Sequence, residues 1–369
     1  MQVLFVVGST GGHIYPALAV AYELRKSFPK VEISFLGPLK ELAQEIISKE
    51  GYHYLGIDTL SWKQKISLLY LIKFFYQNFK SFIESFKYLL RHKPKIVVGF
   101  GSYTCGPALM AAYFLGIPII IHEQNLKLGM TNKILAYLAK KVCLAYPSNS
   151  RLPKKKVVVT GNPIRSNLLF SREKEQVLEK LKSFNLKEGK FTILVFGGSQ
   201  GSKAINEVVV QVLLSSEFNN YPFQMILVTG INNFEQIKKE VEIVKDKVAL
   251  LPYIFDMGPA YLVADVVISR AGASTLAEIT LNGRPAILIP YPYSAYQHQK
   301  ENAFYLKENG AAEVILEEEL NKDKLFKTLL SLYFHPERLR MMMIRSKSLS
   351  NPRANKNVVK VMKEVVKMS

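Results

Sequence analysis

The strongest constraint on the fold is a series of short runs, rich in Val, Ile, Leu and Phe, that alternate with helical patterns. These runs cover residues 2–7, 31–37, 95–100, 117–123, 191–197, 223–230, 248–253, 264–270 and 285–292. Because they are nearly continuous in apolar residues rather than alternating, they are typical of parallel strands buried on both faces. Segments between them, such as 16–26 and 274–282, have helical patterns. The sequence therefore predicts the α/β class, with strand–helix–strand units in both halves.

A chain of 369 residues is long for one hydrophobic core and suits two domains. Ser, Asn, Pro and Lys cluster over residues 146–156, and a Gly-Asn-Pro turn follows at 161–163. We predict two doubly wound, Rossmann-like domains facing across a cleft. The first covers 1–163 and is joined by a C-terminal helix over 352–369, and the second covers 164–351. Ligands of such sheets bind outside the carboxyl ends of the strands.

The balance of charge narrows the possible partners. Lys and Arg number 49 against 30 Asp and Glu, a net charge of +19, which favours nucleic acid, an acidic lipid surface or a phosphorylated substrate as the partner.

Two cysteines are too few for a disulfide framework, so a reducing compartment is expected. The N-terminal run lacks a signal-peptide pattern, and glycine and proline interrupt the uncharged stretch 96–121. We therefore expect neither an export signal nor a membrane span.

Turns rich in glycine follow three of the predicted strands, at residues 8–13, 99–107 and 197–201. Glycine lets the backbone approach a ligand closely, and the N–H groups at the start of the next helix attract anions. Pro16 and Pro107 are expected near the first turns of those helices. One such turn is weak evidence, because many carry glycine for geometry alone, but the set predicts phosphate binding.

The common nucleotide-binding motifs do not fit these turns. GSTGGH lacks the spacing of G-x-G-x-x-G, and the second predicted strand ends in Gly37 rather than in an acidic residue. In GGSQGSKA, Ser202 separates Gly201 from Lys203, so no Walker loop forms. Dinucleotide-dependent dehydrogenases and P-loop NTPases are therefore excluded.

The second half carries polar side chains that suit a nucleotide sugar. In SRAGASTLAE, Ala273 and Ser274 are expected to cap a helix that carries Glu278 in its first turns. This carboxylate can accept both hydroxyls of a ribose, or it can simply complement the helix dipole. The amides of Gln299 and Asn302 both donate and accept, which suits sugar hydroxyls. Alternatively, they belong to a polar loop that enters a helix.

Taken together, these motifs resemble one family. GSTGGHIYPALA, GFGSYTCGP, HEQN, GNPIR, GGSQGS, YIFDM, SRAGASTLAE and HQKENA occur in this order along nearly the whole chain. The ordered set is similar to that of MurG, the family of bacterial lipid I N-acetylglucosaminyltransferases of the GT-B class. The resemblance implies an inverting hexosyltransferase that moves GlcNAc from UDP-GlcNAc to the MurNAc 4-hydroxyl of lipid I, making lipid II for peptidoglycan synthesis. It implies no cofactor and no bound metal.

The resemblance also implies where the substrates bind. The acceptor and its diphosphate belong to the N-terminal domain, and UDP-GlcNAc belongs to the C-terminal domain. The implied substrate-binding residues are Thr10, Gly11, Gly12, Asn125, Arg165, Ser199, Ile254, Ala273, Ser274, Thr275, Leu276, Ala277, Glu278 and Gln299. Among them, Ser199 matches a diphosphate contact and Ile254 a backbone contact to the uracil. Glu278 matches a ribose contact, and Gln299 a contact to the GlcNAc hydroxyls.

The implied reaction needs a base near the acceptor hydroxyl and a stabilised leaving group. His13 is the candidate base, because it lies in the first glycine turn and histidine titrates near neutral pH. His122 and Glu123 are the rival candidates.

The chain departs from the family pattern at a few positions. Ser9 and Ser102 stand where glycine is common, which is tolerable unless φ is positive there. Tyr296 and Gln297 stand where acidic residues often precede the HQ pair, and this affects the geometry expected around Gln299.

Residues 62–95 are basic and aromatic, with eight Lys and Arg against one acidic residue. Phe75, Phe79, Phe82 and Phe86 recur at helical spacing and are predicted to form one aromatic face. The segment is either a core-packing helix with a basic edge or a helix that lies on an anionic membrane, where each lysine contributes about 1 kcal/mol. A polyprenyl-linked substrate favours the second interpretation, and with it a peripheral protein at the cytoplasmic face of the bacterial inner membrane.

Other functions remain as alternatives. A transferase of the same fold could use another lipid acceptor, such as diacylglycerol, although HEQN and GNPIR together favour lipid I. A UDP-sugar epimerase of the same fold would need no lipid acceptor. A nucleic-acid-binding protein would explain the charge, but no nucleic-acid-binding module is recognisable, so no such partner is expected.

Overall fold

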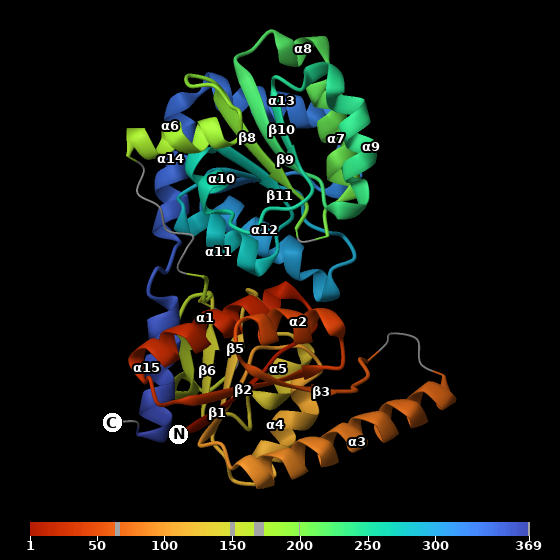
Figure 1. The fold of residues 1–369 in the computed structure, drawn as a ribbon, viewed down its shortest axis with the longest axis vertical. Helices are drawn as coiled ribbons and strands as arrows, with labels where there is room; N and C mark the ends of the chain where they lie inside the picture. Colours follow the sequence, from red (N-terminus) through yellow and green to blue (C-terminus); the bar gives the residue numbers. More distant parts are fainter. Residues whose placement is uncertain (63–66, 148–151, 166–172, 199, 368–369) are drawn as a thin grey trace. The chain divides into compact units, whose positions relative to one another are not determined.

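The computed structural model describes residues 1–62, 67–147, 152–165, 173–198 and 200–367. The chain divides into two compact units: unit 1 comprises residues 1–165 and 351–369, and unit 2 comprises residues 166–350. Each unit is built on one parallel sheet with helices packed against it (Figure 1). The predicted fold class, two doubly wound Rossmann-like units, is confirmed.

Unit 1 contains a seven-stranded sheet in the order β3-β2-β1-β4-β5-β6-β7. The strands are β1 (Gln2–Val6), β2 (Glu32–Pro38), β3 (His53–Ile57), β4 (Ile96–Gly99), β5 (Ile119–Glu123), β6 (Lys141–Leu144) and β7 (Val157–Val159). The helices are α1 (Gly11–Ser27), α2 (Glu41–Lys49), α3 (Leu68–His92), α4 (Cys105–Phe114), α5 (Met130–Leu135), the short 3₁₀ turn η1 (Lys154–Lys156) and α15 (Ala354–Val366).

The sheet of unit 1 is buried on both faces, as its apolar strands predicted. Val3 and Phe5 of β1 pack with α1, α2 and α15 on one face. Leu4 and Val6, which alternate with them, pack with α3, α4 and α5 on the other. The C-terminal helix α15 therefore completes the core that begins with the first strand, and it lies beside α1 (Figure 1).

Unit 2 contains a six-stranded sheet in the order β10-β9-β8-β11-β12-β13. The strands are β8 (Phe191–Phe196), β9 (Phe223–Val228), β10 (Val248–Leu251), β11 (Val266–Ser269), β12 (Ala286–Leu288) and β13 (Ala312–Val314). The helices are α6 (Lys174–Ser183), α7 (Lys203–Leu213), α8 (Ser216–Asn219), α9 (Ile231–Val241), α10 (Gly258–Val263), α11 (Ala273–Leu281), α12 (His298–Glu308), α13 (Lys322–Phe334) and α14 (Pro336–Ser348), with 3₁₀ turns η3 (Glu242–Val244), η4 (Ala295–Gln297) and η5 (Glu317–Glu319).

The strand runs predicted from sequence all fall on strands, whereas β3, β6, β7 and β13 were not predicted. Three of these four are the edges of a sheet, where a strand needs no long apolar run because it is less completely covered. One helix start was wrong: α1 begins at Gly11, so Pro16 lies inside the helix rather than in its first turn. The glycines taken for a turn form the first turn of α1 itself.

The uncharged stretch 96–121 folds as β4, α4 and most of β5. Among the helices that the structure describes, none has an apolar stretch long enough to cross a membrane. Pro107 lies in the first turn of α4, as predicted.

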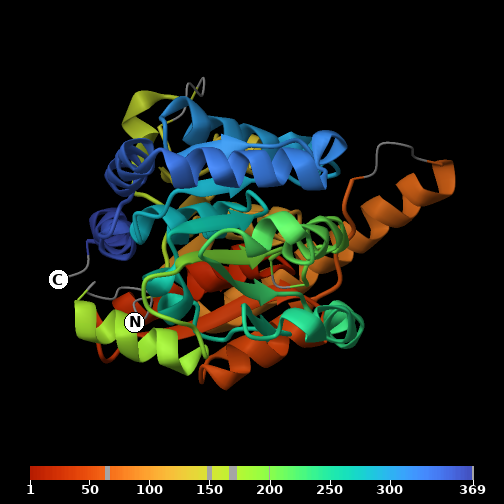
Figure 2. The same ribbon diagram turned by 90° about the horizontal axis from the view of Figure 1, so that it is seen from above.

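The predicted aromatic face of α3 is present, since the ring of Phe82 lies 6.3 Å from that of Phe79 and 5.9 Å from that of Phe86, but only one end of this face is buried. Phe82 and Phe86 pack against the core of unit 1, whereas Phe75 and Phe79 are 61% and 65% exposed. Six of the exposed apolar side chains follow the N-terminal half of the helix, which extends away from the rest of unit 1 (Figure 2). They are Leu68, Leu69, Ile72, Phe75, Tyr76 and Phe79, here called the α3 apolar face.

Candidate active site

The carboxyl ends of β1, β4 and β5 bring the first predicted site residues together. His13 is half-buried in the first turn of α1, and its Nδ1 lies 2.9 Å from Oγ1 of Thr10, the residue that precedes the helix. The helix start also contributes Gly11 and Gly12, whose N–H groups belong to the first turn and have no helical acceptor. This is a place where an anion or a hydroxyl can be bound by the backbone.

The neighbouring glycines make room for the imidazole of His13. A methyl group on Gly8 would lie 2.8 Å from His13 Nδ1, and one on Gly101 would lie 3.2 Å from its Cδ2. Ser102 is adjacent and has φ +78°. Serine was expected to be tolerable at this position unless φ is positive. Because φ is positive, Ser102 is a strained residue. Ser9 is not among the described residues with positive φ.

The rival base His122 is completely buried on β5. Its Nε2–H donates to the carbonyl of Gly161 at 3.0 Å, and its ring stacks on Phe100 with centroids 5.7 Å apart. Burial lowers the pKa of His122 to about 4, so the side chain is neutral near pH 7. Since a base must reach the acceptor hydroxyl, these contacts favour a structural role for His122.

Glu123, the other rival, organises the loop that follows β5. Its Oε1 accepts the backbone and side-chain N–H groups of Asn125 at 3.1 and 3.0 Å. Its Oε2 accepts from Gly129 N at 2.9 Å and from Asn132 Nδ2 at 2.8 Å. With both oxygens accepting hydrogen bonds and the residue 3% exposed, this carboxylate positions Asn125.

Arg165 is fixed beside α1 by a segment that the C-terminal helix holds. Asn355 of α15 accepts from Ile164 N at 3.1 Å and donates to Ile164 O at 2.9 Å. Asn357 donates to Thr160 O at 3.1 Å. The guanidinium of Arg165 lies 4.4 Å above the ring of Tyr15, two residues after His13.

In unit 2, the predicted donor helix α11 begins at Ala273 after Gly272. Glu278 is half-buried in its second turn, and its Oε2 accepts from the hydroxyl of the fully buried Tyr261 at 3.0 Å. Burial raises the pKa of Tyr261, so the phenol stays protonated and keeps donating. Leu276 is fully buried, which leaves its backbone as the part able to contact a ligand.

The start of α11 also has unused polar capacity. Ser274 Oγ is buried and has no hydrogen-bond partner among the described residues, and no side chain caps the helix. Thr275 and Ala277 are half-buried in the same turns. The first turn of α11 can therefore donate to an anionic ligand.

The glycine turn after β8 lies next to this helix start in the sheet order. Ser199 lies outside the described residues. Gly201 has φ +76°, and a methyl group there would lie 2.1 Å from Thr229 O, so only glycine fits. Ser202 ends the turn and caps α7, since its Oγ accepts from Ile205 N at 3.5 Å.

Gln299 lies in the first turn of α12 and contacts the arm that joins β12 to this helix. Its Oε1 accepts from Tyr291 N at 3.0 Å, while the preceding Tyr296 and Gln297 both have positive φ, +51° and +55°. Two consecutive residues in this conformation are strained. Ile254, predicted to contact the uracil, is half-buried in the loop that follows β10.

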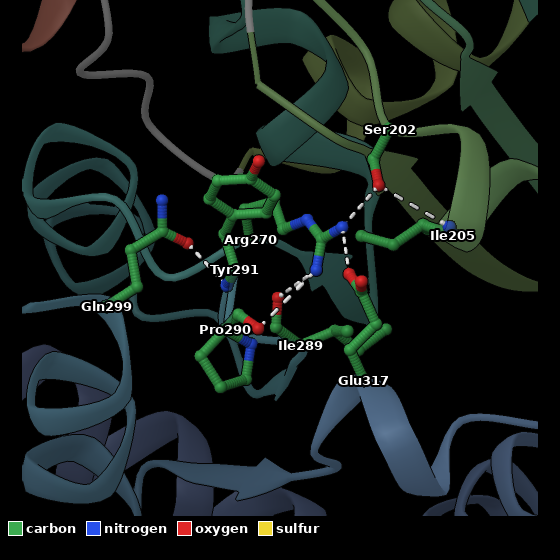
Figure 3. Close-up of polar contacts among 8 residues, drawn as sticks. All are labelled: Ser202, Ile205, Arg270, Ile289, Pro290, Tyr291, Gln299 and Glu317. Carbon is green, nitrogen blue, oxygen red and sulfur yellow. Dashed lines mark hydrogen bonds and ion pairs between the residues drawn. The ribbon is translucent and has the colours of Figure 1, made fainter. Parts of the chain in front are cut away.

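Arg270 lies at the centre of these unit 2 elements and was not predicted (Figure 3). It directly follows β11, and its side chain is 10% exposed. Its Nη2 donates to Ser202 Oγ at 2.8 Å and forms an ion pair with Glu317. Its Nη1 donates to Ile289 O at 3.2 Å, and its guanidinium lies 5.4 Å from the ring of Tyr291.

Both units match models of known domains. Residues 3–144 match the glycosyltransferase family 28 N-terminal domain, and residues 192–358 match the family 28 C-terminal domain. The chain belongs to glycosyltransferase family 28. It is 40% identical, over 99% of its length and 100% of the relative's, to a UDP-N-acetylglucosamine–N-acetylmuramyl-(pentapeptide) pyrophosphoryl-undecaprenol N-acetylglucosamine transferase from Caldanaerobacter subterraneus subsp. tengcongensis.

Solved structures agree with the family 28 assignment. The crystal structure of Acinetobacter baumannii MurG matches with a TM-score of 0.77 and 27% identity, covering 100% of this chain and 99% of that one. A UDP-GlcNAc 2-epimerase from Neisseria meningitidis bound to UDP-GlcNAc matches with a TM-score of 0.67 and 17% identity, covering 99% of this chain and 100% of that one. At that identity the second match shows the fold alone. The predicted resemblance to the MurG family is confirmed.

In this family 28 chain, sequence reasoning missed Arg270, Ser202 and Glu317. A signal existed for Arg270, because a charged residue directly after an apolar strand is unusual unless it has partners at the sheet edge. Ser202 is the last residue of the motif GGSQGS, but no role was predicted for it. Glu317 begins a run of three glutamates, which resembles an ordinary solvated acidic turn, so its partner could be found only in the fold.

Proposed function

We propose that this family 28 enzyme transfers N-acetylglucosamine from UDP-N-acetylglucosamine to an undecaprenyl-diphosphate-linked N-acetylmuramyl-pentapeptide. The observation that carries the proposal is the 40% identity, over 99% of the chain, to a transferase of that name. The alternative with a diacylglycerol acceptor has no comparable support.

Unit 2 is proposed to hold the donor. The first turn of α11, with the unused hydroxyl of Ser274, would receive the diphosphate together with the glycine turn after β8. Glu278 would accept the ribose hydroxyls while Tyr261 fixes its second oxygen. The amide of Gln299 would contact the sugar, and the backbone of Ile254 would contact the uracil.

Unit 1 is proposed to hold the acceptor and the base. In the tautomer with the hydrogen on Nδ1, His13 donates to Thr10 and its Nε2 is the basic nitrogen. This nitrogen would take the proton of the acceptor 4-hydroxyl as the oxygen attacks the anomeric carbon from the side opposite UDP. The new glycosidic bond forms as the bond to the diphosphate breaks, so the configuration inverts and UDP leaves with the electron pair. Asn125 and Arg165 would bind substrate beside this base.

A test of the reaction measures UDP release from UDP-GlcNAc with and without a short-chain lipid I analogue. We expect release that depends on the analogue and yields the disaccharide product. Binding of UDP-GlcNAc without analogue-dependent release would refute this acceptor. For the base, His13→Ala should lower kcat strongly with little change in KM. A variant that keeps kcat and raises only KM would show that His13 merely positions substrate. The matched control is His53→Ala, on the exposed start of β3.

The α3 apolar face is proposed to dock the enzyme on the cytoplasmic surface of the membrane as a peripheral protein. This helix exposes six large apolar side chains, and exposed apolar patches of this kind mark sites of interaction with proteins or membranes. Lys73, Lys80 and Lys87 are exposed on the same helix, where they can meet anionic headgroups. Docking there would keep unit 1 next to a lipid-linked acceptor.

Vesicle co-sedimentation tests this docking. Since each lysine contributes about 1 kcal/mol, replacing Lys73, Lys80 and Lys87 by Glu should weaken binding to vesicles containing phosphatidylglycerol by about 100-fold or more. The matched control replaces the exposed lysines Lys238, Lys239 and Lys327 of unit 2 in the same way. Equal partitioning of the two triple variants would remove α3 as the docking surface.

A further inference from the structure

Arg270 joins the carboxyl ends of four neighbouring strands of unit 2. In the sheet order β8-β11-β12-β13, Ser202 follows β8, Arg270 follows β11, Ile289 follows β12 and Glu317 follows β13. The guanidinium contacts the other three residues (Figure 3). Because ligands of parallel sheets bind at this edge, the side chain lies under the proposed donor site.

The contacts of Arg270 favour a positioning role over direct ligand binding. Its two terminal nitrogens already donate to a hydroxyl and to the carbonyls of Ile289 and Pro290, at 2.8, 3.2 and 3.5 Å. The guanidinium is also paired with a carboxylate, and the residue is 9% exposed. A buried guanidinium with its donors occupied fixes the groups around it, because its planar fork sets their directions.

Those groups belong to two separate parts of the donor site. Through Ser202, Arg270 holds the end of the glycine turn and the start of α7. Through the carbonyls of Ile289 and Pro290, it holds the arm in which Tyr291 N donates to Gln299 Oε1 at 3.0 Å. The side chain therefore sets the spacing between the proposed diphosphate turn and the proposed sugar arm.

We propose that Glu317 is a positioning residue for the donor site and acts by orienting Arg270. Its carboxylate is the anionic partner of the guanidinium, and its side chain is 24% exposed. Without it, Arg270 would retain a buried charge whose remaining partners are neutral, and the fork would turn away from the donor site toward water. This inference rests on the proposed function, since it concerns how the same site recognises UDP.

A positioning role and a purely electrostatic effect of Glu317 predict opposite changes in UDP affinity when Glu317 is replaced by Gln. Glu317→Gln removes a negative charge close to the place where a diphosphate would bind. If only the field mattered, UDP would bind more tightly to the variant. If Glu317 orients Arg270, UDP should bind about tenfold more weakly, because the ion pair that fixes the direction of the guanidinium is lost.

The experiment measures the Kd of UDP by calorimetry for the full-length protein, Glu317→Gln and Glu318→Gln. Glu318 is the matched control, because it lies in the same 3₁₀ turn and is exposed. We expect about tenfold weaker binding for Glu317→Gln and an unchanged Kd for Glu318→Gln. Unchanged or tighter binding by Glu317→Gln would overturn the proposal. No UDP binding by the unsubstituted protein would instead refute the proposed function, and the role of Glu317 with it.

A second set of variants separates positioning from general destabilisation. Arg270→Lys keeps the charge but loses the planar fork, so it should also weaken UDP binding. The double variant Arg270→Lys with Glu317→Gln should be no weaker than Arg270→Lys alone, because Glu317 acts through Arg270. Additive losses in the double variant, or recovery of UDP binding under stabilising co-solvent, would overturn the proposal in favour of a merely structural ion pair.

Discussion

The buried histidine His122 should make unit 1 sensitive to acid over a defined range of pH. The unfolded chain takes up a proton on this histidine near its ordinary pKa of 6.5, whereas the folded protein does so only near a pKa of about 4. Between these values the unfolded state binds more protons, so the free energy of unfolding falls as the pH falls. Above pH 6.5 the histidine is neutral in both states, and its contribution no longer changes.

The magnitude follows from the two pKa values. Lowering the pH from 7.5 to 4.5 crosses most of the interval between 6.5 and about 4, which at 1.36 kcal/mol per pKa unit costs about 2.5 kcal/mol. The residue is completely buried, so solvent does not screen the effect. Protonation would also give Nδ1 a hydrogen with no acceptor among the described residues.

The assay is urea unfolding followed by the fluorescence of Trp62. This is the sole tryptophan of the sequence and lies in unit 1, so the signal reports the unfolding of that unit. The variant His122→Gln keeps an N–H donor for Gly161 but cannot titrate. Every carboxylate is present in both proteins, so the difference between their pH profiles reports on His122.

We expect His122→Gln to lose about 2.5 kcal/mol less than the unsubstituted protein between pH 7.5 and 4.5. His53→Gln, on the exposed start of β3, should follow the unsubstituted profile. Parallel profiles for His122→Gln and the unsubstituted protein would refute the reasoning, because they would mean that the folded state protonates this histidine as readily as the unfolded state does.

Other predictions follow from strain and from fixed contacts. Ser102→Gly should raise the free energy of unfolding of unit 1 by about 0.5–1 kcal/mol, since glycine accepts φ +78°; a loss of stability in urea would contradict this. Asn355→Leu should lower it by about 2 kcal/mol, because two hydrogen bonds to Ile164 are lost, and thermal unfolding that is unchanged would contradict it. Tyr261→Phe should weaken UDP binding about three- to tenfold, because Glu278 loses its donor; calorimetry that gives an unchanged Kd would remove Tyr261 from the site.

Most interior strands could be predicted from the sequence, whereas three of the four edge strands could not. Strands such as β1 and β8 must be apolar on both faces, and this requirement leaves a visible run in the sequence. The edge strands β3, β7 and β13 carry no such requirement, so their short segments resembled loops. The start of α1 was misplaced for a related reason: glycines at a helix start and glycines in a turn look alike in a sequence.

The sequence predicted site residues that lie within a recognisable motif. It did not predict residues that orient them from distant parts of the chain. Glu278 was placed on the donor helix from its motif, but Tyr261, which orients it, is on another helix. Ser202 lies 68 residues before Arg270, and no local pattern indicates that they meet. Ser102 shows a further limit, because the sequence reveals a small side chain but not the sign of φ.

The return of α15 to unit 1 has a consequence for how the protein is made. The chain leaves unit 1 after residue 165 and comes back at residue 351, and Val358, Val359, Val361 and Met362 complete the core around Val3 and Phe5. These residues are synthesised only after every residue of unit 2. Unit 1 therefore cannot complete its core until all of unit 2 has been made, and the earliest-made part of the chain waits with an apolar face exposed, in contrast to the usual N-terminal-first order. A chain cut short after residue 350 would carry every residue of unit 2, but its first unit would stay open to chaperones and proteases.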